Sequence, residues 1–288
     1  MNRSRIVATR THEHRSGTPL RSMLQHAALP ALVLLITACG ASDHPSGRYT
    51  REVFSSVTVD RGIAYRASPS RELDLYRPAG DGETGRPAVV WVHGGGFAGG
   101  DRTSSIVPFP ESFAKSGYVV ASIDYDTTAS QPCVAAPHLR PDCRALLDDA
   151  VGDGQEAVRW LRRNAGAYGV DPDRVAIAGE SAGGLTAAGV GTRARDAATS
   201  VRAWVSISGG LDGVTDVDAR DAPGLLFANT EDPYVPFAWS ADAERALRRV
   251  GVATKLVPID GVGHVPADRV DQFIAESRAF LRDQLDLG

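Results

Sequence analysis

The sequence GESAGG at positions 179–184 contains a serine whose surroundings favour nucleophilic chemistry. An apolar run at 174–178 precedes it and small residues at 185–188 follow, which is the pattern of a strand, a tight turn and a helix. In this context G-x-S-x-G holds the serine hydroxyl clear of the sheet, at a helix N-terminus that favours negative charge. A glycine-rich turn that only packs the helix closely is the alternative. The preceding strand favours Ser181 as a nucleophile.

A run of glycines, HGGGFAGGD at positions 93–101, follows another apolar run at 88–92. Glycines let backbone N–H groups approach a substrate where an oxyanion forms, which stabilises the transition state by about 3–4 kcal/mol per donor. A loop that only needs flexibility is the alternative, but it would not need a histidine and a phenylalanine at its ends. We predict an oxyanion hole formed by the N–H groups of Gly95, Gly96 and Ala182.

The general base is predicted at a later strand end. His264 follows the apolar run 254–259 and is the only histidine after the serine. In folds with a G-x-S-x-G turn the order along the chain is serine, acid, histidine. His93 precedes the serine, so we expect it to anchor the glycine loop and not to act as the base.

The acid is predicted between the serine and the histidine. Asp232 begins the sequence DPYVP directly after the strand pattern 224–228, which would hold its carboxylate at a rigid turn. Glu231 and Asp212 remain alternatives, because they also follow strands. In the resulting triad, Ser181 attacks an acyl carbon, the histidine moves the proton, and the aspartate holds the imidazole tautomer.

Alternating strand and helix patterns must position these residues. Apolar runs that suit buried parallel strands occur at 88–92, 118–123, 174–178, 201–207, 224–228 and 254–259. Helical patterns occupy 146–167, 182–193, 237–250 and 267–284. Residues 71–77 alternate in polarity, as an antiparallel edge strand does. We predict one α/β domain over 51–288, a mostly parallel, doubly wound sheet with helices on both faces and its site at the carboxyl ends of the strands.

The composition is that of an ordinary globular protein and argues against a nucleic-acid partner. The 288 residues are 43% hydrophobic and 23% charged, with a formal net charge of −4. Residues 1–38 carry five arginines and one glutamate, so the remainder carries a net −8. An acidic body repels phosphate backbones.

The N-terminus has the pattern of an export signal. An arginine-bearing stretch leads into the apolar run 27–38, which is too short for a stable membrane span. The sequence ITAC at 36–39 resembles a bacterial lipobox, so we predict a signal peptide over 1–38, lipidation of Cys39 and a polar tether over 39–50. A plain signal peptide is the alternative. The protein would then be exported, either anchored to a membrane in the cell envelope or secreted.

Cys133 and Cys143 form an even pair in a chain expected to be exported, which predicts a disulfide. Closing a loop of this size could contribute about 3 kcal/mol. The loop is also a candidate lid, and we expect its reduction to change specificity more than stability. A metal site with His138 is the rival interpretation, but no fourth ligand lies nearby. We expect no metal.

These motifs together resemble the HGGG-bearing α/β-hydrolases, the carboxylesterase group that includes hormone-sensitive-lipase-like and feruloyl-esterase-like enzymes. The similarity begins near Asp74 and includes LDLYRP at 73–78, VDPDRV at 170–175, the glycine loop and the serine motif. The resemblance implies hydrolysis of small-molecule esters through an acyl-enzyme, without a cofactor. Tyr125-Asp126 departs from the Tyr-Arg pair usual in the group.

A short stretch between Ile207 and Leu225 implies that the helical cap of the lipase-like members is missing. An open site of this kind predicts a preference for short-chain carboxylic esters. A serine peptidase of the same fold is one alternative, although oligopeptidase relatives carry a further large domain. A non-catalytic envelope lipoprotein is another, but it would not explain three glycine-rich strand ends.

Overall fold

The structure is a computed structural model, and it describes residues 46–67, 70–133 and 138–288. These residues belong to one compact unit, His44–Gly288. Within the described part, no helix combines the length and apolar composition needed to cross a bilayer. The predicted signal peptide over 1–38 and Cys39 lie outside the described residues, and the expectations about them stay predictions.

Residues 46–50, the last part of the predicted tether, form turns that pack against the domain. The guanidinium of Arg48 is buried and pairs with the carboxylate of Asp81 at 2.9 Å. The Tyr49 N–H donates to the carbonyl oxygen of Ser116 at 2.8 Å. The domain therefore begins before residue 51, because these contacts hold the preceding residues on it.

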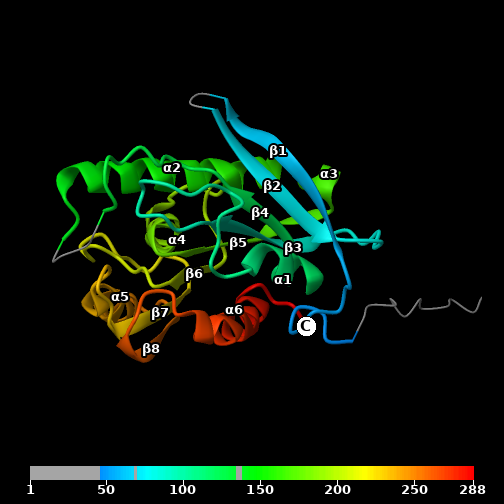
Figure 1. The fold of residues 1–288 in the computed structure, drawn as a ribbon. Coiled ribbons are helices and arrows are strands. Elements are labelled where there is room, and N and C mark those ends of the chain that lie inside the picture. The colour runs from blue at the N-terminus through cyan, green and yellow to red at the C-terminus, as the bar shows by residue number, and fades with distance from the viewer. Residues whose placement is uncertain (1–45, 68–69, 134–137) are drawn as a thin grey trace, which may run out of the picture. The chain divides into compact units, whose positions relative to one another are not determined.

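A single sheet of eight strands forms the centre of the domain, in the order β1-β2-β4-β3-β5-β6-β7-β8 (Figure 1). The strands are β1 Val57–Ala67, β2 Ser70–Pro78, β3 Arg86–Val92, β4 Val119–Ile123, β5 Val170–Glu180, β6 Trp204–Ile207, β7 Gly224–Glu231 and β8 Thr254–Val262. β2 pairs antiparallel with β1 and with β4, and all strands from β4 to β8 in the sheet order run parallel. The predicted mostly parallel α/β sheet is confirmed.

Helices cover both faces of this sheet (Figure 1). They are α1 Phe109–Lys115, α2 Pro141–Arg163, α3 Ala165–Tyr168, α4 Ala182–Arg193, α5 Phe237–Arg249 and α6 Val270–Gln284, the last preceded by a 3₁₀ turn at Ala267–Arg269. One hydrophobic core joins α2, α4 and α5 to the sheet, and a second joins α1 and α6 to the opposite face. This is the doubly wound arrangement that the alternation of elements predicts.

The central strand β3 is continuously apolar from Ala88 to Val92 because both of its faces are covered. All seven of its residues are buried. Val90 and Val92 point into the core under α2 and α4, while Val89 and Trp91 point into the core under α1 and α6. Because successive side chains of a strand face opposite sides of the sheet, a strand covered on both faces needs an apolar residue at each position.

The stretch between β6 and β7, residues 208–223, contains neither helix nor strand. The expectation of a minimal cap is therefore correct for this connection. Two elements were not expected from the sequence: the edge strand β1, and the short helix α1. α2 also begins at Pro141, five residues before its predicted start, because proline is well suited to the first turn of a helix.

Candidate active site

Ser181 occupies the one-residue turn between β5, which ends at Glu180, and α4, which begins at Ala182. Its φ of 54° and ψ of −120° are a combination that residues with a side chain rarely adopt. The Ser181 N–H donates to the carbonyl oxygen of Ile207 on the neighbouring strand β6 at 2.8 Å, which holds the turn in place. The strained turn lifts the hydroxyl away from the sheet at the N-terminus of α4.

The glycines of the motif are required by close backbone contacts. A Cβ added at Gly179 would lie 2.3 Å from the carbonyl oxygen of Gly183. A Cβ added at Gly183 would lie 2.1 Å from the carbonyl oxygen of Val92, at the end of β3. Any side chain at either position would therefore force the helix away from the sheet and displace the serine.

Three predicted residues meet at the carboxyl ends of β5, β7 and β8. The Nε2 atom of His264 lies 2.7 Å from the Oγ of Ser181. The Nδ1 atom of the same imidazole lies 2.7 Å from the Oδ2 of Asp232. A carboxylate only accepts hydrogen bonds, so the proton of the neutral ring is on Nδ1. Nε2 is then free to accept the serine proton.

The turn after β7 fixes the carboxylate of Asp232. Its Oδ1 accepts the backbone N–H groups of Tyr234 at 2.8 Å and of Val235 at 3.0 Å. Only 2% of the side chain is exposed. The second oxygen is therefore left pointing at the imidazole, in the orientation that the DPYVP turn predicts.

A residue that sequence reasoning missed holds the histidine loop. The buried Ser208 follows β6, and its Oγ accepts the N–H of Val265 at 3.0 Å. Val265 has a φ of 50°, a costly conformation for a β-branched residue. This bond therefore restrains the strained residue next to His264. A polar residue directly after a buried strand was the available signal.

The predicted oxyanion loop lies beside the serine. Gly95 has a φ of 120° and Gly96 a φ of 62°, and both line the same pocket as Ser181 and Ala182. A Cβ added at Gly95 would lie 2.0 Å from the carbonyl oxygen of Gly99, so only glycine fits there. Ala182 is the first residue of α4, and the first N–H groups of a helix have no partner within the helix. The structure thus brings together the three predicted donors.

The side chain of His93 anchors the glycine loop, as expected. Its Nδ1 lies 2.6 Å from the carbonyl oxygen of Gly94 and must donate to it. Its ring stacks on Tyr125 with 4.4 Å between centroids, and the Tyr125 hydroxyl donates to the His93 carbonyl oxygen at 2.9 Å. Burial lowers the pKa of His93 below its usual value of 6.5. The imidazole is therefore a neutral structural group.

The lowered pKa of His93 gives a testable pH dependence. The unfolded chain takes up a proton as the pH falls below about 6.5, whereas the folded protein resists it until the lowered pKa is reached. The free energy of unfolding should therefore fall across this window by at most about 1.4 kcal/mol per pH unit. In His93→Asn, which keeps a donor for Gly94, the contribution of His93 to this slope should be lost. Urea unfolding at about pH 7 and pH 5 measures it, and an unchanged slope in the variant would contradict the assignment.

Glu180, the residue before the serine, is a second residue that the sequence did not single out. It is 2% exposed, and its two carboxylate oxygens accept the N–H groups of Ile106 at 2.9 Å and Val107 at 3.0 Å. Burial raises the pKa of Glu180, while these hydrogen bonds oppose the rise. The carboxylate thereby ties the segment before α1 to the turn that carries the nucleophile.

The site opens into a largely apolar pocket of about 570 Å³, within the range of small-molecule pockets. Among the described residues that line it, one carboxyl group and one imidazole are present, those of Glu180 and His264. Ile106 is 56% exposed and Tyr234 is 51% exposed, so the pocket is open to solvent beside these residues. Its apolar wall is formed by Phe97, Ile106, Pro132, Leu185, Tyr234 and Val235.

The alternative acids have other surroundings. Glu231 is the exposed last residue of β7. Asp212 is buried, and its carboxylate pairs with Arg144 and accepts the Leu139 N–H at 3.2 Å.

Cys133 and Cys143 are joined in a disulfide, and His138 contacts Asp212 at 3.1 Å. Within the described residues, no cluster of histidine, cysteine and carboxylate groups could hold a metal.

The BD-FAE family model matches residues 73–209, which contain the oxyanion loop and the serine turn. The solved Thermogutta terrifontis esterase 2 phosphoramylated by tabun has a similar fold, with a TM-score of 0.64 and 23% identity over 80% of this chain and 95% of that one. The chain has the α/β-hydrolase fold. Its similarities lie with carboxylesterases of the hormone-sensitive-lipase-like group. The same esterase has also been solved with butyrate bound, with a TM-score of 0.61 and 22% identity.

Among curated proteins, the chain is 30% identical over 138 residues to the esterase LipI of Mycobacterium tuberculosis. That match covers 48% of the chain and 39% of LipI. It is 24% identical over 281 residues to a probable isoprenylcysteine alpha-carbonyl methylesterase of Oryza sativa subsp. japonica, covering 81% of the chain and 63% of the relative. The chain therefore spans less than two thirds of the length of either relative.

Proposed function

We propose that the chain is a serine esterase that hydrolyses short-chain carboxylic esters through an acyl-enzyme. The observation that carries the proposal is the hydrogen-bonded series from Asp232 to His264 to Ser181, with 2.7 Å at each step; His264 and Ser181 line an apolar pocket. A hydroxyl, a base and an orienting acid in this arrangement are the groups that acyl transfer requires. The esterases among the relatives support the same chemistry.

In the first half-reaction, the Oγ of Ser181 attacks the carbonyl carbon of the ester while Nε2 of His264 takes its proton. The buried carboxylate of Asp232 stabilises the imidazolium that forms. The negative charge on the former carbonyl oxygen is stabilised by the N–H groups of Gly95, Gly96 and Ala182. The imidazolium then protonates the departing alcohol, which leaves an acyl group on the serine.

In the second half-reaction, water replaces the alcohol. Nε2 of His264 takes a proton from the water as it attacks the acyl carbon, and the same donors stabilise the second oxyanion. Collapse of this intermediate breaks the bond to Ser181 Oγ, which recovers its proton from the histidine. The residues of the site are sufficient for each proton transfer in this scheme.

The direct test is turnover of p-nitrophenyl acetate by the purified protein, together with labelling by a fluorophosphonate. We expect hydrolysis at a rate proportional to enzyme concentration, and loss of activity in step with the labelling of one serine, Ser181. Turnover that survives complete labelling of Ser181 would contradict the proposal.

The pocket predicts a dependence on acyl-chain length. Each methylene that is desolvated contributes about 0.8 kcal/mol, but a methylene that reaches the open side of the pocket stays in water and contributes little. Residues 208–223 form no helix over the site, and the exposed Ile106 and Tyr234 border the opening. The bound butyrate in the Thermogutta esterase is consistent with a short acyl group. We expect kcat/KM to peak at acetyl to butyryl esters and to fall by octanoyl, in a series of p-nitrophenyl esters.

A series in which kcat/KM rises continuously to dodecanoyl would contradict this expectation. It would mean that an apolar surface beyond the opening binds the end of the chain. The esterase activity itself would still stand, because that outcome concerns only which acyl group is preferred.

A further inference from the structure

The oxyanion loop receives two hydrogen bonds from a segment that lies outside the glycine run. The Cys133 N–H donates to the carbonyl oxygen of Gly96 at 2.9 Å, and the Ala129 N–H donates to that of Phe97 at 2.9 Å. A Cβ added at Gly96 would also lie 3.0 Å from the Cβ of Pro132, so the two segments are in close contact. A bond to the Gly96 carbonyl restrains the residue whose own N–H is a proposed oxyanion donor.

This supporting segment has little regular structure of its own. Residues 124–133 follow β4 and contain neither helix nor strand, so no ladder of backbone bonds fixes them. Pro132 and Cys133 nevertheless form part of the pocket wall. The position of the oxyanion loop therefore depends on whatever holds the end of this segment.

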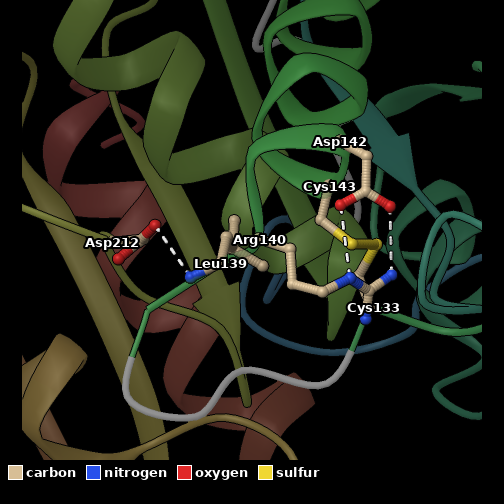
Figure 2. The surroundings of a disulfide bond; sticks show 6 residues. All are labelled: Cys133, Leu139, Arg140, Asp142, Cys143 and Asp212. Carbon is tan, nitrogen blue, oxygen red and sulfur yellow. Dashed lines mark hydrogen bonds and ion pairs between the residues drawn. A yellow bond between two sulfur atoms is a disulfide. The ribbon is translucent and has the colours of Figure 1, made fainter.

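A disulfide joins the end of the segment to the start of α2. Cys133 is bonded to Cys143, which lies in the first turn of the helix and is 1% exposed (Figure 2). Further along α2, Leu147 and Ala150 pack into the hydrophobic core. The disulfide therefore connects the irregular segment to an element that the core holds firmly.

The start of α2 is also held from a second direction. The buried carboxylate of Asp212 accepts the Leu139 N–H at 3.2 Å, as Figure 2 shows, and pairs with Arg144 on the next turn. Arg144 also donates to the Asp212 carbonyl oxygen at 3.3 Å. The point to which the disulfide is attached is thus anchored on both sides of Cys143.

We propose that the Cys133–Cys143 disulfide is a positioning element for catalysis, which keeps the Cys133 N–H on the Gly96 carbonyl and thereby keeps the oxyanion donors aimed at the reacting carbon. This inference rests on the proposed esterase function. Oxyanion donors act mainly on the transition state, and small displacements of such groups lower rates strongly. Loss of the bond should therefore reduce kcat more than it weakens substrate binding.

The test compares wild type with Cys133→Ala/Cys143→Ala, using p-nitrophenyl butyrate at a temperature where circular dichroism shows both proteins folded. Fluorophosphonate titration gives the concentration of active sites. We expect kcat to fall about tenfold to a hundredfold with KM changed less than threefold. The affinity for a butyl boronic acid, which forms a tetrahedral adduct on serine, should fall by a similar factor. A purely structural role would lower the melting temperature without this combination.

Arg140→Ala is the matched control. It removes the exposed pair of Arg140 with Asp142, 3.2 Å long and beside the disulfide in Figure 2, but it leaves the sulfur–sulfur bond intact. We expect its kcat and boronate affinity to stay within twofold of wild type. If the double variant does not fold, wild-type enzyme treated with dithiothreitol replaces it. The reagent passes two electrons and two protons to the cystine and is itself oxidised to a cyclic disulfide.

Three outcomes would overturn the inference while the esterase proposal stands. One is a double variant whose kcat and boronate affinity match those of an active wild type. Another is an increase in KM with kcat unchanged, which would assign the disulfide to substrate binding. The third is free thiols at both Cys133 and Cys143 in the purified active enzyme. A wild type that neither hydrolyses esters nor reacts with a fluorophosphonate would instead refute the proposed function.

Discussion

Replacing Ser181 with alanine should lower kcat for p-nitrophenyl acetate by a factor of about 10³ or more and leave the fold intact. The variant loses the hydroxyl that attacks the ester, while the oxyanion donors and the pocket remain. Its backbone bond to the carbonyl oxygen of Ile207 does not involve the side chain, so the turn should persist. The measurement is steady-state kinetics beside a thermal unfolding curve. A folded variant that retains a tenth of the wild-type kcat would contradict the role of this serine.

Asp232→Asn should lower kcat by about 10³–10⁴. The asparagine can still accept the N–H groups of Tyr234 and Val235 through its oxygen, so the turn after β7 should be kept. Its amide would then face Nδ1 of His264 and donate to it. The ring proton would be forced onto Nε2, and the imidazole could no longer accept the serine proton.

Glu231→Gln is the matched control for this prediction. Glu231 is adjacent to Asp232 in the sequence but is exposed. The kcat of Glu231→Gln should therefore stay within about twofold of wild type, as expected of a surface substitution. Equal losses in the two variants, or a larger loss in Glu231→Gln, would mean that the acid has been assigned to the wrong residue. The comparison resolves an ambiguity that two neighbouring carboxylates create in the sequence.

Much of the architecture follows from local pattern, since the strands that carry the site are buried on both faces. β3 is one example, because each of its positions from Ala88 to Val92 must be apolar to fill one core or the other. β1 was missed for the opposite reason. It lies at the edge of the sheet and most of its residues are partly or fully exposed, so its sequence carries no continuous apolar signal.

Residues of the site could be predicted only where a reactive residue type lies in a recognisable motif at the end of a strand. The serine turn, the glycine loop and the single later histidine are local features at strand ends, and the fold brings such ends to one edge of the sheet. Asp212 shows the limit of this reasoning, because it also follows a strand yet is engaged by Arg144 and Leu139. The roles of Glu180 and Ser208 depend on contacts with residues distant in sequence, and the one local signal was the polar residue directly after the buried strand β6.

The most direct test of the central claim is to trap the acyl-enzyme. The protein is mixed with p-nitrophenyl acetate, quenched in acid during turnover, digested and analysed by mass spectrometry. The account predicts one acetyl group, carried by the peptide that contains Ser181, and its disappearance once the substrate is exhausted. Sustained ester hydrolysis with no acetylated peptide, or with the acetyl group on a different residue, would contradict it.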